Sequence, residues 1–282
     1  MRHTGSSGTR RAVALAMAVL LVAACGDDNN DNGGGAVGPD ASPNLPTHDQ
    51  LKAALDQAQA EQNKGFGLDM WATVVDRSGV VRAIAFTGAK EGDQWPASRV
   101  ISAQKANTAN SLSLTGLSLA PANLYSAVQP GGSLFGLQES NPVNTDAAYG
   151  GNADDYGTTS DFMIGKRIGG VNVFGGGVAL YDASGAVIGA VGVSGDTSCA
   201  AHSIAWKVRD YLRVGPNSDA AVDYVPGGVD PASHLDNIVF DIDANGVSAS
   251  GWGHPVCPIV ASEVIAEGQA LPTTNPVSTV TP

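Results

Sequence analysis

The alternation of apolar runs and turn residues is clearest over residues 174–199. Two apolar runs, at 178–181 and 187–193, flank a D-A-S-G turn in which the glycine can adopt a positive φ. This pattern predicts an antiparallel hairpin whose second strand is buried. Gly192 and Gly195 leave the end of that strand without side chains. We therefore expect another group to approach the backbone closely there.

Periodicity along the rest of the chain predicts three helices and a second hairpin. In order, these are a helix begun by a Thr47-x-x-Gln50 capping box, strands at Trp71–Asp76 and Val80–Phe86, a helix over Ser98–Ser111, and a helix after Gly195 that Asp196, Thr197 or Ser198 can cap. Together they predict one α+β domain, with an antiparallel sheet and packed helices.

The C-terminal part predicts a further hairpin. Apolar residues at 238–240 and Val247 flank a D-x-N-G turn. The segment 241–246 matches the first half of a calcium loop, but its twelfth position is Trp252 rather than glutamate, so we interpret it as a turn. The tail after Gly268 is rich in Thr, Pro and Val, and we expect it to be frayed.

Three motifs, in order, resemble the HbpS/GlcG-like family of haem-binding or haem-degrading domains. They are V-V-D-R-S-G at 74–79, K-A-N-T-A at 105–109 and G-A-V-G-V-S-G at 189–195. The resemblance covers 47–213 and implies profilin-like α-β layers and a haem-type ligand.

The chain departs from the family pattern in two places. Residues 115–166 form a longer, irregular insertion, in which specificity can reside; a surface loop without a role is the alternative. Residues 214–282 form a C-terminal extension beyond the family core.

The first 24 residues predict a secretory signal, because a basic start precedes an apolar run too short to span a bilayer. The V-A-A-C sequence ending at Cys25 resembles a bacterial lipobox, which implies lipidation of Cys25. An ordinary signal peptide with an incidental cysteine is the alternative. Residues 25–46, rich in Gly, Asp and Asn, predict a disordered tether. Gly26 implies, by resemblance to lipoprotein sorting rules, an outer-membrane location in the cell envelope, facing the periplasm or the surface.

Charge limits the partners. The chain has 15 Lys+Arg and 27 Asp+Glu, a net charge of −12, and removing the signal also removes three arginines. Such an acidic chain disfavours nucleic acid and anionic lipid as partners, so we expect membrane contact through the lipid anchor alone. Solubility is the plainer interpretation of the charge.

The two remaining cysteines, Cys199 and Cys257, predict a disulfide in an oxidising compartment. In the chain-entropy model such a bond would stabilise the fold by about 4 kcal/mol. Metal ligation and a haem thiolate are the alternatives.

Haem requires an apolar slot, an axial ligand and partners for its propionates. His202 lies three residues after Cys199 on the same helix face and is the first candidate for an axial or second-sphere ligand. The disulfide would bring His254 to the same end as a second imidazole. Structural roles are the alternative for both histidines, while His48 and His234 lie in segments that we expect to be solvated or loop-like.

Other candidate ligand-binding residues lie at the predicted corner, which is the junction between the strand that ends near Ser194 and the helix that follows Gly195. They are Gly192, Ser194 and Gly195, together with Lys105, which matches the family pattern. Lys105 can meet a carboxylate such as a propionate, or its stem can pack on the sheet. The strand leads into a helix N-terminus, which favours an anionic group.

The sequence favours an extracytoplasmic lipoprotein that binds a tetrapyrrole for capture, sensing or buffering. An enzyme of haem or small-molecule degradation and a structural envelope protein are the alternatives, and a homo-oligomer stays open. Several enzyme motifs are excluded: Asp196 stands where G-x-S-x-G requires glycine, and H-E-x-x-H does not occur.

Overall fold

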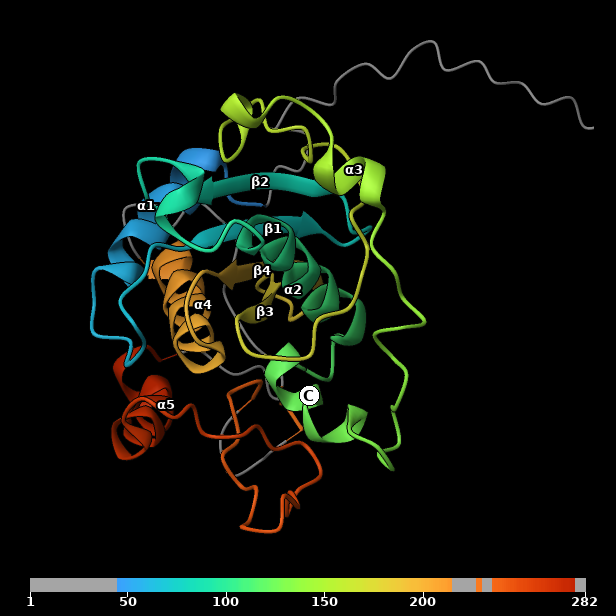
Figure 1. The fold of residues 1–282 in the computed structure, drawn as a ribbon, viewed down its shortest axis with the longest axis vertical. Helices are drawn as coiled ribbons and strands as arrows, with labels where there is room; N and C mark the ends of the chain where they lie inside the picture. The colour runs from blue at the N-terminus through green and yellow to red at the C-terminus, as the bar shows by residue number, and fades with distance from the viewer. Residues whose placement is uncertain (1–44, 215–226, 230–234, 277–282) are drawn as a thin grey trace, which may run out of the picture. The chain divides into compact units, whose positions relative to one another are not determined.

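The computed structural model describes residues 45–214, 227–229 and 235–276, which belong to one compact unit. Its centre is a four-stranded antiparallel sheet in the order β2-β1-β4-β3 (Figure 1). The strands are β1 (Trp71–Asp76), β2 (Val81–Phe86), β3 (Gly177–Tyr181) and β4 (Val187–Ser194). The main helices are α1 (His48–Gln59), α2 (Ser98–Leu112), α4 (Ser198–Val214) and α5 (Ala261–Thr274).

The predicted α+β class and both predicted hairpins of the domain are confirmed. The predicted signal, residues 25–44 of the predicted tether with the lipidated Cys25, and His234 lie outside the described residues. The last two residues of that tether, Leu45 and Pro46, are ordered instead: Leu45 packs against the core and Pro46 is buried. No helix in the described part of the chain is long and apolar enough to cross a membrane.

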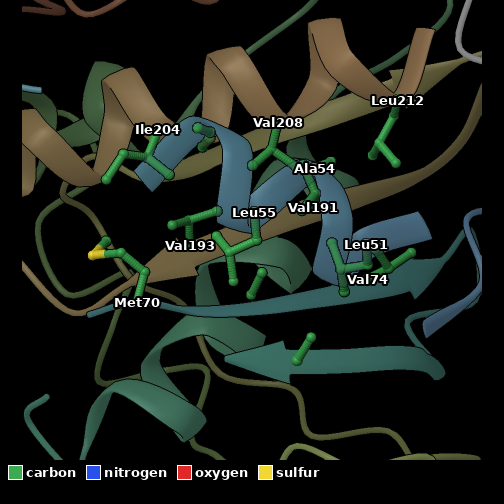
Figure 2. Packing of buried hydrophobic residues seen from close by; sticks show 14 of the residues in the cluster. Leu51, Ala54, Leu55, Met70, Val74, Val191, Val193, Ile204, Val208 and Leu212 are labelled. Atoms are coloured by element: carbon green, nitrogen blue, oxygen red, sulfur yellow. The ribbon is translucent and has the colours of Figure 1, made fainter. Parts of the chain in front are cut away.

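Helices α1 and α4 cover one face of the sheet (Figure 2). Leu55 of α1, Val208 of α4 and Val191 of β4 belong to one cluster of buried side chains. The predicted capping box begins α1: the Thr47 hydroxyl accepts the Gln50 N–H, and the Gln50 side chain accepts the Thr47 N–H. Local capping and burial therefore favour the same helix.

Helix α2 packs directly against the backbone of the opposite face of the sheet. Its small residues Ala103, Ala106 and Ala109 are fully buried. A Cβ at Gly192 of β4 would overlap the carbonyl oxygen of Ser102 and the backbone nitrogen of Ala106. The group that approaches the bare backbone at Gly192 is thus a helix of the same chain.

The insertion at 115–166 consists of short 3-10 turns and the five-residue helix α3 (Thr145–Tyr149). A buried ion pair holds it to α2, because Arg99 Nε donates to Asp161 at 2.9 Å. The same guanidinium donates to the Ala148 carbonyl at 2.8 Å and lies 3.6 Å from the centre of the Tyr156 ring. Loss of either charge would leave the other buried and unpaired.

The C-terminal extension differs from its prediction. The predicted hairpin is reduced to a turn closed by one isolated bridge, between Ile242 and Ser248. The prediction of a frayed tail after Gly268 was wrong up to residue 274, because this segment continues α5. Leu271 of α5 is fully buried, and the Trp206 indole of α4 donates to the Asn275 carbonyl at 3.0 Å. Burial against α4 offsets the weak helix propensity of the tail.

The contact at Gly192 yields a stability prediction. We expect Gly192→Ala to lower the free energy of unfolding by about 1–3 kcal/mol, because the clash is with helix backbone rather than with a flexible side chain. The matched control is Gly116→Ala, where an added Cβ meets nothing within 4 Å. Urea denaturation of both variants measures the difference, and equal stability of the two would contradict this packing.

Candidate functional site

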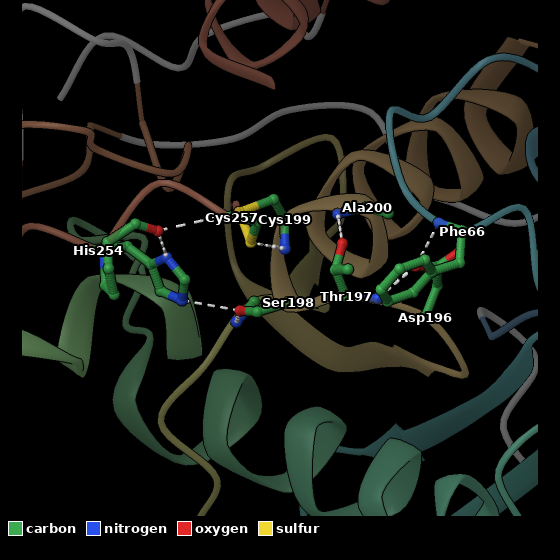
Figure 3. Close-up of a disulfide and its surroundings, with 10 residues drawn as sticks. Phe66, Asp196, Thr197, Ser198, Cys199, Ala200, His254 and Cys257 are labelled. Carbon is green, nitrogen blue, oxygen red and sulfur yellow. Dashed lines mark hydrogen bonds between the residues drawn. A yellow bond between two sulfur atoms is a disulfide. The ribbon is translucent and has the colours of Figure 1, made fainter. Parts of the chain in front are cut away.

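The end of β4 leads directly into the start of α4. Three residues were candidates for the cap, and Thr197 takes the role: its hydroxyl accepts the Ala200 N–H at 3.2 Å (Figure 3). The Asp196 carboxylate instead accepts the N–H groups of Phe66 and Leu68, at 2.9 and 3.1 Å. Ser198 is then the first residue of α4 and is only partly buried.

The predicted disulfide between Cys199 and Cys257 is present (Figure 3). Its Cα atoms lie 6.1 Å apart, and it links positions separated by 58 residues. It therefore ties the first turn of α4 to the extension, beside His254.

Ser198 and His254 form a hydrogen-bond chain whose direction can be derived. The Pro255 carbonyl can only accept, so His254 Nδ1 carries the ring proton and donates to it at 2.6 Å. In the neutral ring Nε2 is then the acceptor, and the Ser198 hydroxyl donates to it at 2.7 Å. Ser198 Oγ in turn accepts the Gly175 N–H at 2.7 Å. His254 thus holds its Nε2 lone pair towards a serine hydroxyl.

The environment keeps His254 neutral. Burial lowers its pKa to about 4, the hydrogen bond to the Pro255 carbonyl opposes this shift, and the nearby charge of Lys105 adds to it. The ring also lies beside Tyr125, with the two ring centres 5.3 Å apart. At neutral pH the imidazole is therefore an acceptor or a ligand and not a cation.

Lys105 is buried in the interface between α2 and β4. Its Nζ donates to the Val193 carbonyl at 3.1 Å and lies 3.5 Å from Ser194 Oγ. Burial lowers the pKa of Lys105 to about 7, and no described carboxylate forms an ion pair with it. The partly exposed ring of Phe174 has its centre 5.3 Å from Nζ. The stem packs on the sheet, and the amine lies inside the protein at the predicted corner.

His202 is fully buried, so it is not a residue of the helix surface. Neither ring nitrogen has a hydrogen-bond partner among the described residues. Burial lowers the pKa of His202 to about 4; nearby Asp236 and the side chain of Asn237 raise it, whereas Arg209 and His254 lower it. The two predicted imidazoles are thus close enough to affect each other electrostatically.

The remaining candidate residues line the same corner from inside. Ser194 is 5 % exposed. A Cβ at Gly195 would overlap the Asp69 carbonyl oxygen and lie 2.8 Å from Met70. Like Gly192, Gly195 therefore allows close packing of the chain on itself.

A buried ion pair that the sequence analysis missed lies near His202. Arg209 donates two hydrogen bonds to Asp236, at 2.7 and 2.8 Å, and both side chains are fully buried. The Arg209 guanidinium also lies 4.7 Å from the Trp206 ring centre. Nothing in the local pattern around either residue pointed to this pair, whose members are 27 residues apart.

A groove of about 630 Å³ lies elsewhere, between the segment that follows β2 and the insertion. Phe86 and Tyr156 contribute aromatic surface to it, and Lys90 and Asp154 contribute charge. Its volume falls within the usual range for small-molecule sites. No group of three or more potential metal-ligating side chains occurs in the part of the chain that the structure describes.

These observations define an α+β domain in which a disulfide-anchored helix start gathers two neutral histidines and a buried lysine. Residues 47–209 match the family model described as "Haem degrading protein HbpS-like". The chain belongs to this HbpS-like family.

Three of the solved structures that are similar to this chain are the following. Protein ORFY of Klebsiella pneumoniae shares 29 % identity, over 59 % of this chain and 87 % of that chain, with a TM-score of 0.41. A PduOC–haem complex shares 23 %, over 57 % and 87 %, with a TM-score of 0.39. A double mutant of HbpS from Streptomyces reticuli shares 14 %, over 71 % and 96 %, with a TM-score of 0.34. No curated protein sequence matches the chain.

The two buried histidines predict a loss of stability in mild acid. Their pKa is about 4 in the folded protein against the usual 6.5 of a solvated histidine, so between these values only the unfolded chain takes up protons as the pH falls. Stability should therefore be complete above pH 6.5 and decrease towards pH 4, by about 1.4 kcal/mol per pH unit for each histidine.

Urea denaturation at pH 7 and pH 5 measures this loss. His202→Gln and His254→Gln should each reduce the difference in stability between the two pH values, whereas Gln57→Ala at an exposed position of α1, which removes no titratable group, should leave it unchanged. An identical pH dependence in all four proteins would refute the assignment.

Proposed function

We propose that this protein binds haem or a related tetrapyrrole outside the cytoplasm, for capture, sensing or buffering. The observation that carries the proposal is the match of residues 47–209 to a family whose description names haem. The site geometry then supports particular residues as the contacts.

His254 is the better placed of the two imidazoles to ligate iron. Neutral imidazole is the form that binds metals, and burial keeps His254 in that form. Its Nε2 reaches the partly exposed Ser198, so a ligand that displaces this hydroxyl meets the lone pair. The rings of Tyr125 and Phe174 add apolar surface nearby.

His202 is a second buried imidazole, and neither of its nitrogens forms a hydrogen bond with a described residue. Such orphaned polar atoms are costly unless a partner is present, which is compatible with a ligand in this region. Because His202 is fully buried, we assign it a supporting position and His254 the direct contact. Haem, when bound, supplies the redox chemistry of its iron.

Charge sets the expected strength of binding. Lys105 is a cation whose charge affects the pKa of His254, and it can meet a propionate once it is protonated. The chain as a whole is acidic, with a net charge of −12, which opposes the approach of a dianionic porphyrin. We therefore expect modest affinity that increases with salt.

Haemin titration tests the proposal. The mature protein should shift the Soret band of haemin, and His254→Ala should change both the spectrum and the affinity. His202→Ala and Lys105→Ala should weaken binding without replacing the axial ligand. The matched control is His48→Ala, whose imidazole bonds to the Gly157 carbonyl and should leave the spectrum unchanged.

Three outcomes separate the alternatives. No Soret shift with the wild type overturns haem binding. A shift that all three variants retain, but that Tyr156→Phe or Lys90→Ala alters, would move the site to the 630 Å³ groove. Bleaching of the bound Soret band by a reductant in air would favour haem degradation, the alternative function, over storage.

The location forms part of the same proposal. The short apolar segment that ends in V-A-A-C supports a lipid anchor on Cys25 and a place in the bacterial cell envelope. Metabolic labelling with a fatty-acid analogue should mark the wild type, and Cys25→Ala should abolish the label. Unchanged labelling of that variant would contradict the anchor.

A further inference from the structure

The groove of about 630 Å³ is lined by the segment that follows β2 and by the insertion, and none of the proposed haem contacts lines it. We propose that this groove binds a zwitterionic amino acid with an aromatic side chain, of which phenylalanine is the simplest. Its walls supply aromatic surface for the side chain and charges of both signs for the ammonium and carboxylate groups. Small-molecule sites commonly combine apolar walls with a few polar groups that fix the orientation of the ligand.

Two aromatic rings line the groove, and a buried group behind each one holds it in place. Phe86 stacks on the fully buried Trp71, with the ring centres 4.6 Å apart and 23° between the ring planes. The buried Arg99 guanidinium lies 3.6 Å from the centre of the Tyr156 ring. Both lining rings are only partly buried, so they offer fixed, apolar surface to the groove. Such surface favours an aromatic ligand, which gains stacking energy beyond its burial.

Charges of both signs lie around these rings without a partner of opposite charge. Lys90 and Glu91 belong to the wall after β2, and Asp154 belongs to the wall from the insertion. All three are exposed, and none of them forms an ion pair with another described residue. The carboxylate of an amino acid can therefore meet Lys90 while its ammonium group meets Glu91 or Asp154. One cation against two anions disfavours a dianionic porphyrin in the same groove.

The position of Arg99 limits the class of ligand further. A cation attracted to the Tyr156 ring from the groove would compete with the guanidinium that already lies over this ring. A simple amine is therefore a poorer partner for this wall than an uncharged aromatic ring. A zwitterionic aromatic amino acid avoids the conflict, because its ring lies on the apolar surface and its ammonium group lies at the carboxylates.

The wall that carries Lys90 is held in place by its own hydrogen bonds. The Asp93 carboxylate accepts the N–H groups of Ala89 and Lys90, at 2.8 and 3.0 Å. Gln94, in the same segment, is 5 % exposed, and neither polar atom of its amide has a hydrogen-bond partner among the described residues. A buried amide without a partner is costly, and the polar groups of a bound amino acid would offset that cost after a small shift of the segment.

Equilibrium dialysis of the wild-type protein against radiolabelled L-phenylalanine tests the proposal without any variant. Binding should be saturable, and unlabelled analogues should show which groups it needs. Hydrocinnamate, which lacks the ammonium group, and phenethylamine, which lacks the carboxylate, should each compete about fivefold more weakly than L-phenylalanine, as expected for loss of one exposed charge contact. L-Alanine, which lacks the ring, should not compete. Absence of saturable binding, or equal competition by either analogue, would overturn the proposal.

Variants at exposed positions then locate the site. Lys90→Ala should weaken L-phenylalanine binding about fivefold and leave phenethylamine binding unchanged, because that analogue has no carboxylate. The double variant Glu91→Gln/Asp154→Asn should weaken L-phenylalanine binding but not hydrocinnamate binding. The matched control is Lys64→Ala, which removes a lysine that pairs with Glu263 and does not line the groove. Wild-type affinity in Lys90→Ala and in the double variant would refute the groove as the site.

Amino-acid binding and haem binding can be separated in the same protein. Haemin held by His254 should leave L-phenylalanine binding unchanged, because none of the proposed haem contacts lines the groove. Displacement of L-phenylalanine by haemin would instead assign the groove to haem and overturn the amino-acid site. Saturable binding of L-phenylalanine without any Soret shift would support the amino-acid site and reject the haem proposal.

Discussion

The close contact between α2 and β4 at Gly192 is the constraint on which the rest of the site depends. Because an added Cβ would overlap the helix backbone at Ser102 and Ala106, the helix and the strand touch main chain to main chain. Because α2 and β4 are in direct contact, the side chain of Lys105 lies between them, and its amine donates to the Val193 carbonyl. The lowered pKa of this lysine is therefore a consequence of packing rather than of a charged partner.

The disulfide adds what packing alone does not supply. The segment that carries His254 is short of regular structure, and its single described bridge lies at Ile242. A covalent bond from Cys257 to the first turn of α4 fixes this segment where hydrogen bonds alone would have to order it at an entropic cost. The hydrogen bond between Ser198 and His254 can thus form because the disulfide holds the two distant segments together.

The sequence predicted what depends on neighbouring residues and on apolar periodicity. The capping box at Thr47, both hairpins and the pairing of Cys199 with Cys257 follow from short motifs or from a count of cysteines. The pairs Ser198–His254 and Arg209–Asp236 join residues 56 and 27 positions apart, and no local pattern encodes such contacts. Helix α5 was missed because tertiary burial overrides the low helix propensity of its Thr and Pro residues.

Burial keeps the imidazole of His254 neutral, so the lone pair on its Nε2 is available to a hydrogen-bond donor or to a metal ion. In a solvated histidine, protonation would occupy Nε2 in mild acid; here the lowered pKa keeps that nitrogen free. The hydrogen bond from Nδ1 to the Pro255 carbonyl fixes the tautomer, so Nε2 is the nitrogen that carries the lone pair. This lone pair can accept the hydrogen bond of the Ser198 hydroxyl or bind a metal ion, but not both at once. A ligand that takes the lone pair must therefore displace the Ser198 hydroxyl.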